Sequence, residues 1–206
     1  MATVGDGVTR MTVSGSQRKA ALAAQAREEL DALAARGVWM AGNGYSSVVL
    51  VKGELNEGER AGAELLSGRD GDGLRAALSR QGFAPEDFCG LAAVPSPGSE
   101  PTADAARGGD GVLPVELFRE ALEALDPEAV ILLDTTAIGL MREAYADALA
   151  AIEDFDTAML TPGRIAPVLG RRVLPLDGFE AALGNPEDKR RMWHYLQRLK
   201  PAAAPY

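Results

Sequence analysis

Four short apolar runs, rich in β-branched residues, alternate with helix-forming segments along this chain, and this alternation restricts the fold strongly. The runs occupy residues 47–51 (SVVLV), 87–94 (DFCGLAAV), 129–133 (AVILL) and 172–176 (RVLPL). Short runs of consecutive apolar residues are typical of parallel strands that are buried on both faces. Strands that alternate with helices predict a sheet covered on both sides. We therefore expect an α/β fold: a three-layer α/β/α sandwich with a central, mostly parallel sheet of about four strands.

The expected helices follow from apolar spacing and from start and stop signals. Residues 17–36 lack glycine and proline, and one face of that helix would carry Leu22, Ala26, Leu30 and Leu33. Further helices are expected over residues 74–81, 113–125 and 136–150, whereas residues 154–164 show no preference. In the last helix Asn185 is the predicted N-cap and Pro186 the first residue. Its apolar stripe would consist of Met192, Trp193, Leu196 and Leu199.

The length of 206 residues fits one large domain better than two. We expect that domain to span residues 17–200. Residues 1–16 are polar and aperiodic, which predicts a mobile N-terminal tail, and residues 201–206 form a short C-terminal tail. Residues 95–111 are rich in proline, glycine and polar side chains, so we expect a flexible loop there.

The single cysteine, Cys89, limits the disulfide and metal chemistry of the chain and indicates its cellular compartment. One thiol can form neither a disulfide framework nor an iron–sulfur cluster, which needs four cysteine ligands. We accordingly expect no metal, no cofactor and a reducing, cytoplasmic setting. No leader pattern and no apolar run of about 20 residues is present, so no membrane partner is expected.

The charge of the chain is unevenly distributed. Its formal net charge is −9, which opposes tight, non-specific binding to nucleic acid. From residue 161 onward, however, eight lysine and arginine residues stand against four acidic ones. The C-terminal cations are either a solvated helix face or a phosphate-facing edge. On the second interpretation the contacts to nucleic acid would come from Arg171, Arg172, Lys189 and Arg190.

Three segments carry a more specific pattern. They are residues 48–74 (VVLVKGELNEGERAGAELLSGRDGDGL), 126–141 (DPEAVILLDTTAIGLM) and 169–200 (LGRRVLPLDGFEAALGNPEDKRRMWHYLQRLK). In this order they resemble the uracil-DNA glycosylases, in particular the bacterial iron–sulfur-type families. The resemblance covers about residues 17–200 and is weakest over residues 95–112. It implies the glycosylase fold and an origin in base-excision DNA repair.

The resemblance assigns roles to individual positions. Glu54, which follows Gly53 in the first loop, matches a carboxylate that handles the attacking water or the developing sugar cation. Leu66 stands where the family stacks an aromatic ring on the flipped base, and leucine has no π-face. Gly90 replaces an asparagine that reads the uracil edge, and Gly178 replaces the histidine that stabilises the uracil anion. Losing such a stabiliser typically costs about 10²–10³ in rate.

Other reactive side chains have alternative interpretations. Cys89 is either a reactive thiol or a small apolar residue in a buried strand. His194, the single histidine, lies within the last helix and is expected to have a structural or surface role. Asp134 and Thr135 either line a cleft or cap the next helix. Glu54 itself is either a pocket residue or a solvated charge in an acidic loop.

Three interpretations of the function, from different classes, follow. The first is a pseudoenzyme: a uracil-DNA glycosylase-like protein that has lost uracil excision and acts as a binding or interaction module, with weakly bound DNA as a partner. The alternative is a DNA N-glycosylase of altered specificity that uses Glu54. A third interpretation, an interaction module whose acidic body binds a basic protein, predicts little affinity for DNA even at low salt.

Overall fold

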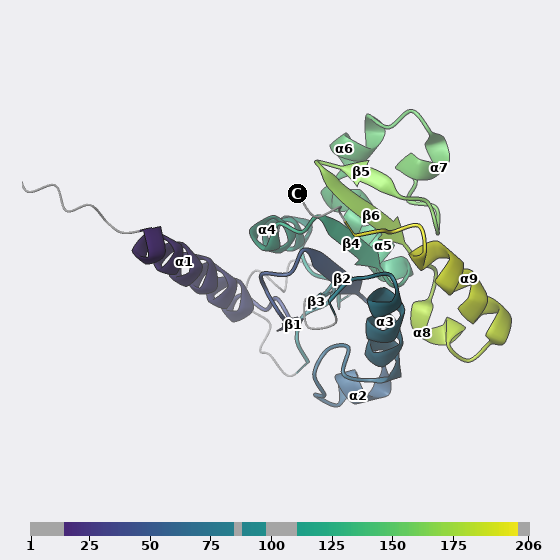
Figure 1. The fold of residues 1–206 in the computed structure, drawn as a ribbon, viewed down its shortest axis with the longest axis horizontal. Coiled ribbons are helices and arrows are strands. Elements are labelled where there is room, and N and C mark those ends of the chain that lie inside the picture. The colour runs from purple at the N-terminus through teal and green to yellow at the C-terminus, as the bar shows by residue number, and fades with distance from the viewer. Residues whose placement is uncertain (1–14, 85–87, 98–110, 202–206) are drawn as a thin grey trace, which may run out of the picture.

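The computed structural model describes residues 15–84, 88–97 and 111–201 (Figure 1). Most of the expected N-terminal tail, residues 98–110 of the expected loop and residues 202–206 lie outside this part of the chain. Helices and strands alternate along the described residues, and the expected α/β class is confirmed.

Within the described residues, six strands form one sheet in the order β1-β3-β2-β4-β6-β5. The four central strands run parallel and correspond to the four predicted runs: β3 (Phe88–Ala92), β2 (Val48–Lys52), β4 (Ala129–Leu132) and β6 (Arg171–Pro175). Two further strands, β1 (Met40–Gly42) and β5 (Ala166–Val168), pair antiparallel at the two edges. The described sheet therefore has two strands more than expected. Segments of three residues are too short to show the alternation by which a strand is recognised in a sequence.

Both faces of the sheet carry a hydrophobic core. Alternate residues of β2 point to opposite sides: Val49 and Val51 belong to one cluster, and Val48 and Leu50 to the other. The first cluster is closed by α1 (Gly15–Ala35), α4 (Val115–Leu125), α5 (Thr135–Ala144) and α6 (Ala146–Ala150). The second is closed by α3 (Arg69–Arg80), α8 (Phe179–Ala182) and α9 (Pro186–Leu196) (Figure 1).

Helix α3 begins at Arg69, five residues before the predicted start at residue 74. The glycines of its first turns mislead a prediction based on helix propensity, because glycine in a helix interior is unfavourable. The packing explains Gly71: a Cβ atom there would lie 1.8 Å from the carbonyl oxygen of Leu66. Gly73 faces α8, and a Cβ atom there would touch Leu183 at 3.6 Å.

Three further differences concern helices. The expected helix over residues 136–150 is divided into α5 and α6 at Tyr145, whose φ of −125° is not helical. Three one-turn helices among the described residues, α2 (Glu57–Arg60), α7 (Phe155–Ala158) and α8, lie in segments where no helix was predicted. In α1 the expected apolar face is only half used: Leu33 is buried, whereas Leu22 is 67% exposed. Figure 1 shows why, since the N-terminal part of α1 projects from the rest of the molecule.

Among the described residues, no helix combines the length and the apolar character needed to cross a membrane.

Candidate functional site

A cavity of about 1000 Å³ opens at the carboxyl ends of the parallel strands. Ligands in open α/β sheets bind at this edge. Its walls come from the segments that follow β2, β3, β4 and β6, together with the first turn of α3. Four loops that lie far apart in the sequence thus share one concave surface.

Glu54 lies in the loop after β2 and its side chain is exposed at the cavity. One carboxylate oxygen, Oε1, accepts a hydrogen bond of 2.9 Å from the Thr135 hydroxyl. The Glu54 backbone N–H donates to Oδ2 of Asp134 at 2.9 Å. The carboxylate is therefore held by the neighbouring loop while remaining accessible to a ligand or a water molecule.

Asp134 fixes the floor of the cavity. Its Oδ2 also accepts from the Gly53 N–H at 2.8 Å, and its Oδ1 accepts from the Ala137 N–H at 2.9 Å as the N-cap of α5. Both alternatives from the sequence hold, because Asp134 lines the cavity and caps the helix. Gly53 is required by this close approach: a Cβ atom there would lie 2.5 Å from the Thr136 side chain.

The strongest electrostatic feature is Lys52, the last residue of β2, whose side chain is 2% exposed. Its ammonium nitrogen lies 2.5 Å from Oδ2 of Asp70, 2.7 Å from Oε2 of Glu59 and 2.8 Å from Oε2 of Glu180. Burial alone would lower the pKa of Lys52, but the bonds to Asp70, Glu180 and Glu59 raise it above the ordinary lysine value. Lys52 is thus a permanent cation at neutral pH.

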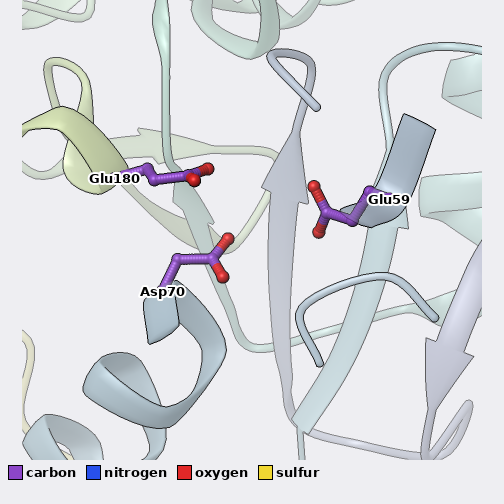
Figure 2. A group of neighbouring side chains, drawn as sticks. All are labelled: Glu59, Asp70 and Glu180. Carbon is purple, nitrogen blue, oxygen red and sulfur yellow. The ribbon is translucent and has the colours of Figure 1, made fainter. Parts of the chain in front are cut away.

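Figure 2 shows the three carboxylates of this cluster, Glu59, Asp70 and Glu180, converging from α2, α3 and α8. One oxygen from each lies within 4.8 Å of the others, a spacing that suits a metal ion. The Lys52 ammonium, however, is bonded to all three carboxylates. The cluster therefore already contains its cation, and a metal ion would have to displace a buried ammonium.

The three carboxylates differ in their other partners. Glu59 is fully engaged: its Oε2 accepts from the Asn56 N–H and its Oε1 from the Leu66 N–H, each at 2.8 Å. Glu180 is 44% exposed at the cavity. Asp70 is 1% exposed, and its Oδ1 has no hydrogen-bond partner among the described residues. Asp70 consequently depends on Lys52 more than either glutamate does.

The structure brings together some of the sequence-predicted site residues. Gly53, Glu54 and Gly178 line the same cavity. Gly178 has φ 66° and stands at the N-cap of α8, a left-handed conformation that favours glycine. Gly90 and Leu66 lie elsewhere, in the core beneath the cavity: Gly90 is in the middle of β3, and a Cβ atom there would lie 3.2 Å from the Leu66 side chain.

The predicted cationic contacts are also separated. Arg171 and Arg172 begin β6 and so lie at the amino edge of the sheet, opposite the cavity. Arg171 bonds to Asp126 at 2.9 Å, and Arg172 donates to the carbonyl oxygen of Lys200. Lys189 and Arg190 project from α9 into a separate groove. These four residues therefore form no continuous phosphate-binding edge around the cavity.

The other two reactive side chains also lie away from the cavity lining. His194 is an exposed residue of α9. Cys89 is 1% exposed in β3, and burial raises the pKa of its thiol to about 12. A neutral, buried thiol agrees with the interpretation of Cys89 as a small apolar core residue.

The described lining of the cavity is acidic. Its carboxylates are Glu54, Glu57, Asp70, Asp134 and Glu180, and its cations are Lys52 and Arg60. The Lys52 cluster was not predicted from the sequence, although one signal was present. A lysine at the end of the apolar run VVLVK must either reach solvent or find a buried carboxylate.

No protein-family model matches the chain, and a search of the curated proteins returns no match.

Proposed function

We propose that this protein is a non-excising relative of the uracil-DNA glycosylases and a binding module. Its cavity would hold a small ligand that carries positive charge or several hydrogen-bond donors. The proposal includes the three-layer α/β/α arrangement that the sequence resemblance implies. Two core clusters on opposite faces of one sheet and four parallel central strands support that arrangement. The main observation in support of this function is the acidic lining of the cavity.

Uracil excision needs an electrophilic partner for the departing base, because negative charge develops on it in the transition state. Gly178 offers no side chain at the position where the resemblance places an imidazole, and the single histidine, His194, lies in α9. The Lys52 ammonium cannot take over this role while it is bonded to three carboxylates. The same acidic lining disfavours a phosphate backbone at the mouth of the cavity.

A ligand rich in donors fits these groups better. Glu54 offers a carboxylate with one described hydrogen bond, and Glu180 presents a carboxylate that is nearly half exposed. Asp70 contributes a buried oxygen without a described partner. Acceptors of this kind stabilise amidinium, ammonium or amino-substituted heterocyclic groups through charge-assisted hydrogen bonds.

The test has two parts. Uracil release from single-stranded and duplex DNA is measured with the wild type and with Glu54→Ala, and we expect no turnover above background. Thermal stabilisation is then measured with cytosine, agmatine and spermidine as donor-rich probes and with uracil and inorganic phosphate as anionic or acceptor-rich controls. We expect stabilisation by a donor-rich probe that is lost in Glu54→Ala. Robust uracil release that disappears in this variant would overturn the proposal.

One observation favours a second candidate, hydrolysis of another N-glycosidic bond. Glu54 is an accessible carboxylate at the cavity, positioned by Thr135 and by the bond of its own N–H to Asp134. In that reaction a water oxygen bonds to the anomeric carbon while the carbon–nitrogen bond breaks. Glu54 accepts the proton of the water, and the base departs with the electron pair of the broken bond and takes a proton from solvent water. A panel of nucleosides and deaminated bases tests this candidate, and it fails if none of them is consumed.

A further inference from the structure

A second concave surface, which we call the basic groove, lies between α3, α8 and α9 and has a volume of about 530 Å³. On α3 it is lined by residues 73, 76, 77 and 80, and on α9 by residues 186, 189, 190, 192, 193 and 196. The α3 set follows the spacing i, i+3, i+4, i+7, which is one face of a helix, and the α9 set contains the same spacing from residue 186 onward. Two helices therefore each present a continuous face to an unfilled space.

The floor of the basic groove is apolar. Small side chains on α3, Ala76 and Ala77, leave room over Leu183, the C-cap of α8, and over Trp193 of α9. Leu183 and Trp193 are each half-buried, so part of their apolar surface remains in contact with water. Each of these helix faces spans eight positions of the sequence and therefore extends over about 11 Å, the length of two to three turns of a further helix.

The rim of the basic groove is cationic. Arg80 stands on one side, Lys189 and Arg190 on the other, and no carboxylate is among the described lining residues. Arg80 and Lys189 are exposed. This balance contrasts with the net charge of −9 of the whole chain. An apolar floor between cationic rims complements a helix with an apolar face flanked by carboxylates.

We propose that the basic groove is a docking site for an acidic amphipathic helix of a partner protein. A nucleic acid is disfavoured as the occupant, because the floor consists of small, aliphatic and aromatic apolar side chains, whereas base edges would need hydrogen-bond donors and acceptors. Phe179 lines both the cavity and the basic groove, but none of the carboxylates of the cavity lines the groove, so the inference does not rest on the proposed small-ligand function.

Tryptophan fluorescence provides the test. The chain contains two tryptophans, and in the Trp39→Phe background Trp193 reports on the basic groove alone. The probe is a synthetic helical peptide of about 14 residues, with leucines at i, i+3, i+4, i+7 and i+11 and glutamates between them. A peptide of the same composition with the leucines distributed around the helix is the control. We expect saturable binding of the first peptide, with an affinity that falls as salt is added.

Matched charge reversals separate docking from non-specific attraction. In Lys189→Glu/Arg190→Glu we expect at least a tenfold loss of affinity. Arg69→Glu/Lys200→Glu changes the net charge by the same amount at exposed positions outside the basic groove, and should leave the affinity within twofold. New glutamates in the first turns of α9 and α3 are favourable for these helices, and Lys200 is exposed beyond the end of α9, so both variants should fold, as circular dichroism would verify.

Four results would overturn the inference. The first is the absence of a saturable response up to about 1 mM peptide. The second is an equal loss of affinity in the two double variants, and the third is tighter binding of a single-stranded oligo(dT) than of the acidic peptide. The fourth is sedimentation of the free protein as a dimer that the Lys189→Glu/Arg190→Glu variant dissociates, because a second copy would then be the occupant.

Discussion

Replacing Lys52 by methionine tests the electrostatic organisation of the cavity most directly. The substitution keeps a long side chain in a space that is 2% exposed but removes the cation that bonds to three carboxylates. Breaking a buried ion pair by removing one partner costs about 3–5 kcal/mol, because the remaining charge is buried without compensation. Glu59 retains two backbone N–H donors and Glu180 can turn to solvent, so most of this cost arises at Asp70. We expect a loss of about 4 kcal/mol in the free energy of unfolding at pH 8.

The pH dependence identifies the cause. In the wild type the pKa of Lys52 is raised, so its contribution is complete below the ordinary lysine pKa of about 10.4 and is lost only as pH rises through the folded value. The wild-type contribution is therefore constant between pH 5 and 8. In Lys52→Met the uncompensated charge is that of Asp70, and protonation removes it. The deficit of the variant should consequently shrink as the pH is lowered from 8 to 5.

Urea denaturation followed by circular dichroism measures these free energies at both pH values. The double variant Lys52→Met/Asp70→Asn should recover about 1 kcal/mol or more, because it removes the stranded charge. Lys200→Met, an exposed lysine, is the control and should change stability by no more than about 0.5 kcal/mol. A deficit of less than about 1 kcal/mol for Lys52→Met at pH 8, or one that does not depend on pH, would refute this reasoning.

Four other results are expected. Mn²⁺ should raise the thermal unfolding midpoint of Lys52→Met but not that of the wild type, since the variant frees three carboxylate oxygens that lie within 4.8 Å of one another. Thermal melts with and without the metal measure this difference. Gly71→Ala should destabilise the protein by about 2 kcal/mol or more, because a Cβ atom there would overlap a carbonyl oxygen at 1.8 Å. Gly139→Ala in α5, where a Cβ atom meets open space, should stabilise the protein by about 0.5–1 kcal/mol. Urea titrations that gave the same sign for both variants would contradict this prediction. Asp134→Ala should cost about 2–4 kcal/mol through the loss of three N–H bonds and Asp134→Asn less, and equal losses on chemical denaturation would count against the capping role. Cys89, with its pKa raised to about 12, should react with a thiol reagent only as fast as the protein opens, so a fast reaction in the folded state would be the contrary outcome.

The central strands and the last helix were predictable because their signals are local. A run such as AVIL in β4 is apolar at every position and can only be buried on both faces. The cap of α9 was equally readable, and Asn185 accepts a hydrogen bond of 2.9 Å from the Glu187 N–H as predicted. The edge strands β1 and β5 were not predictable, because three-residue strands are defined by their partners and not by a pattern of their own.

For the candidate site, the sequence determined which residues follow each central strand, and so placed Gly53, Glu54 and Gly178 at one edge of the sheet. The meeting of Lys52 with carboxylates from three helices could be seen only in the folded chain, since these partners lie up to 128 positions away in the sequence. The fold likewise places Gly90 in the core, and it starts α3 at Arg69, two residues before Gly71, whose absent side chain permits close packing against Leu66. The predictable and the unpredictable features differ for one physical reason. Burial patterns and caps depend on neighbours within a few residues, whereas ion pairs and backbone contacts depend on which distant segments the folded sheet brings together.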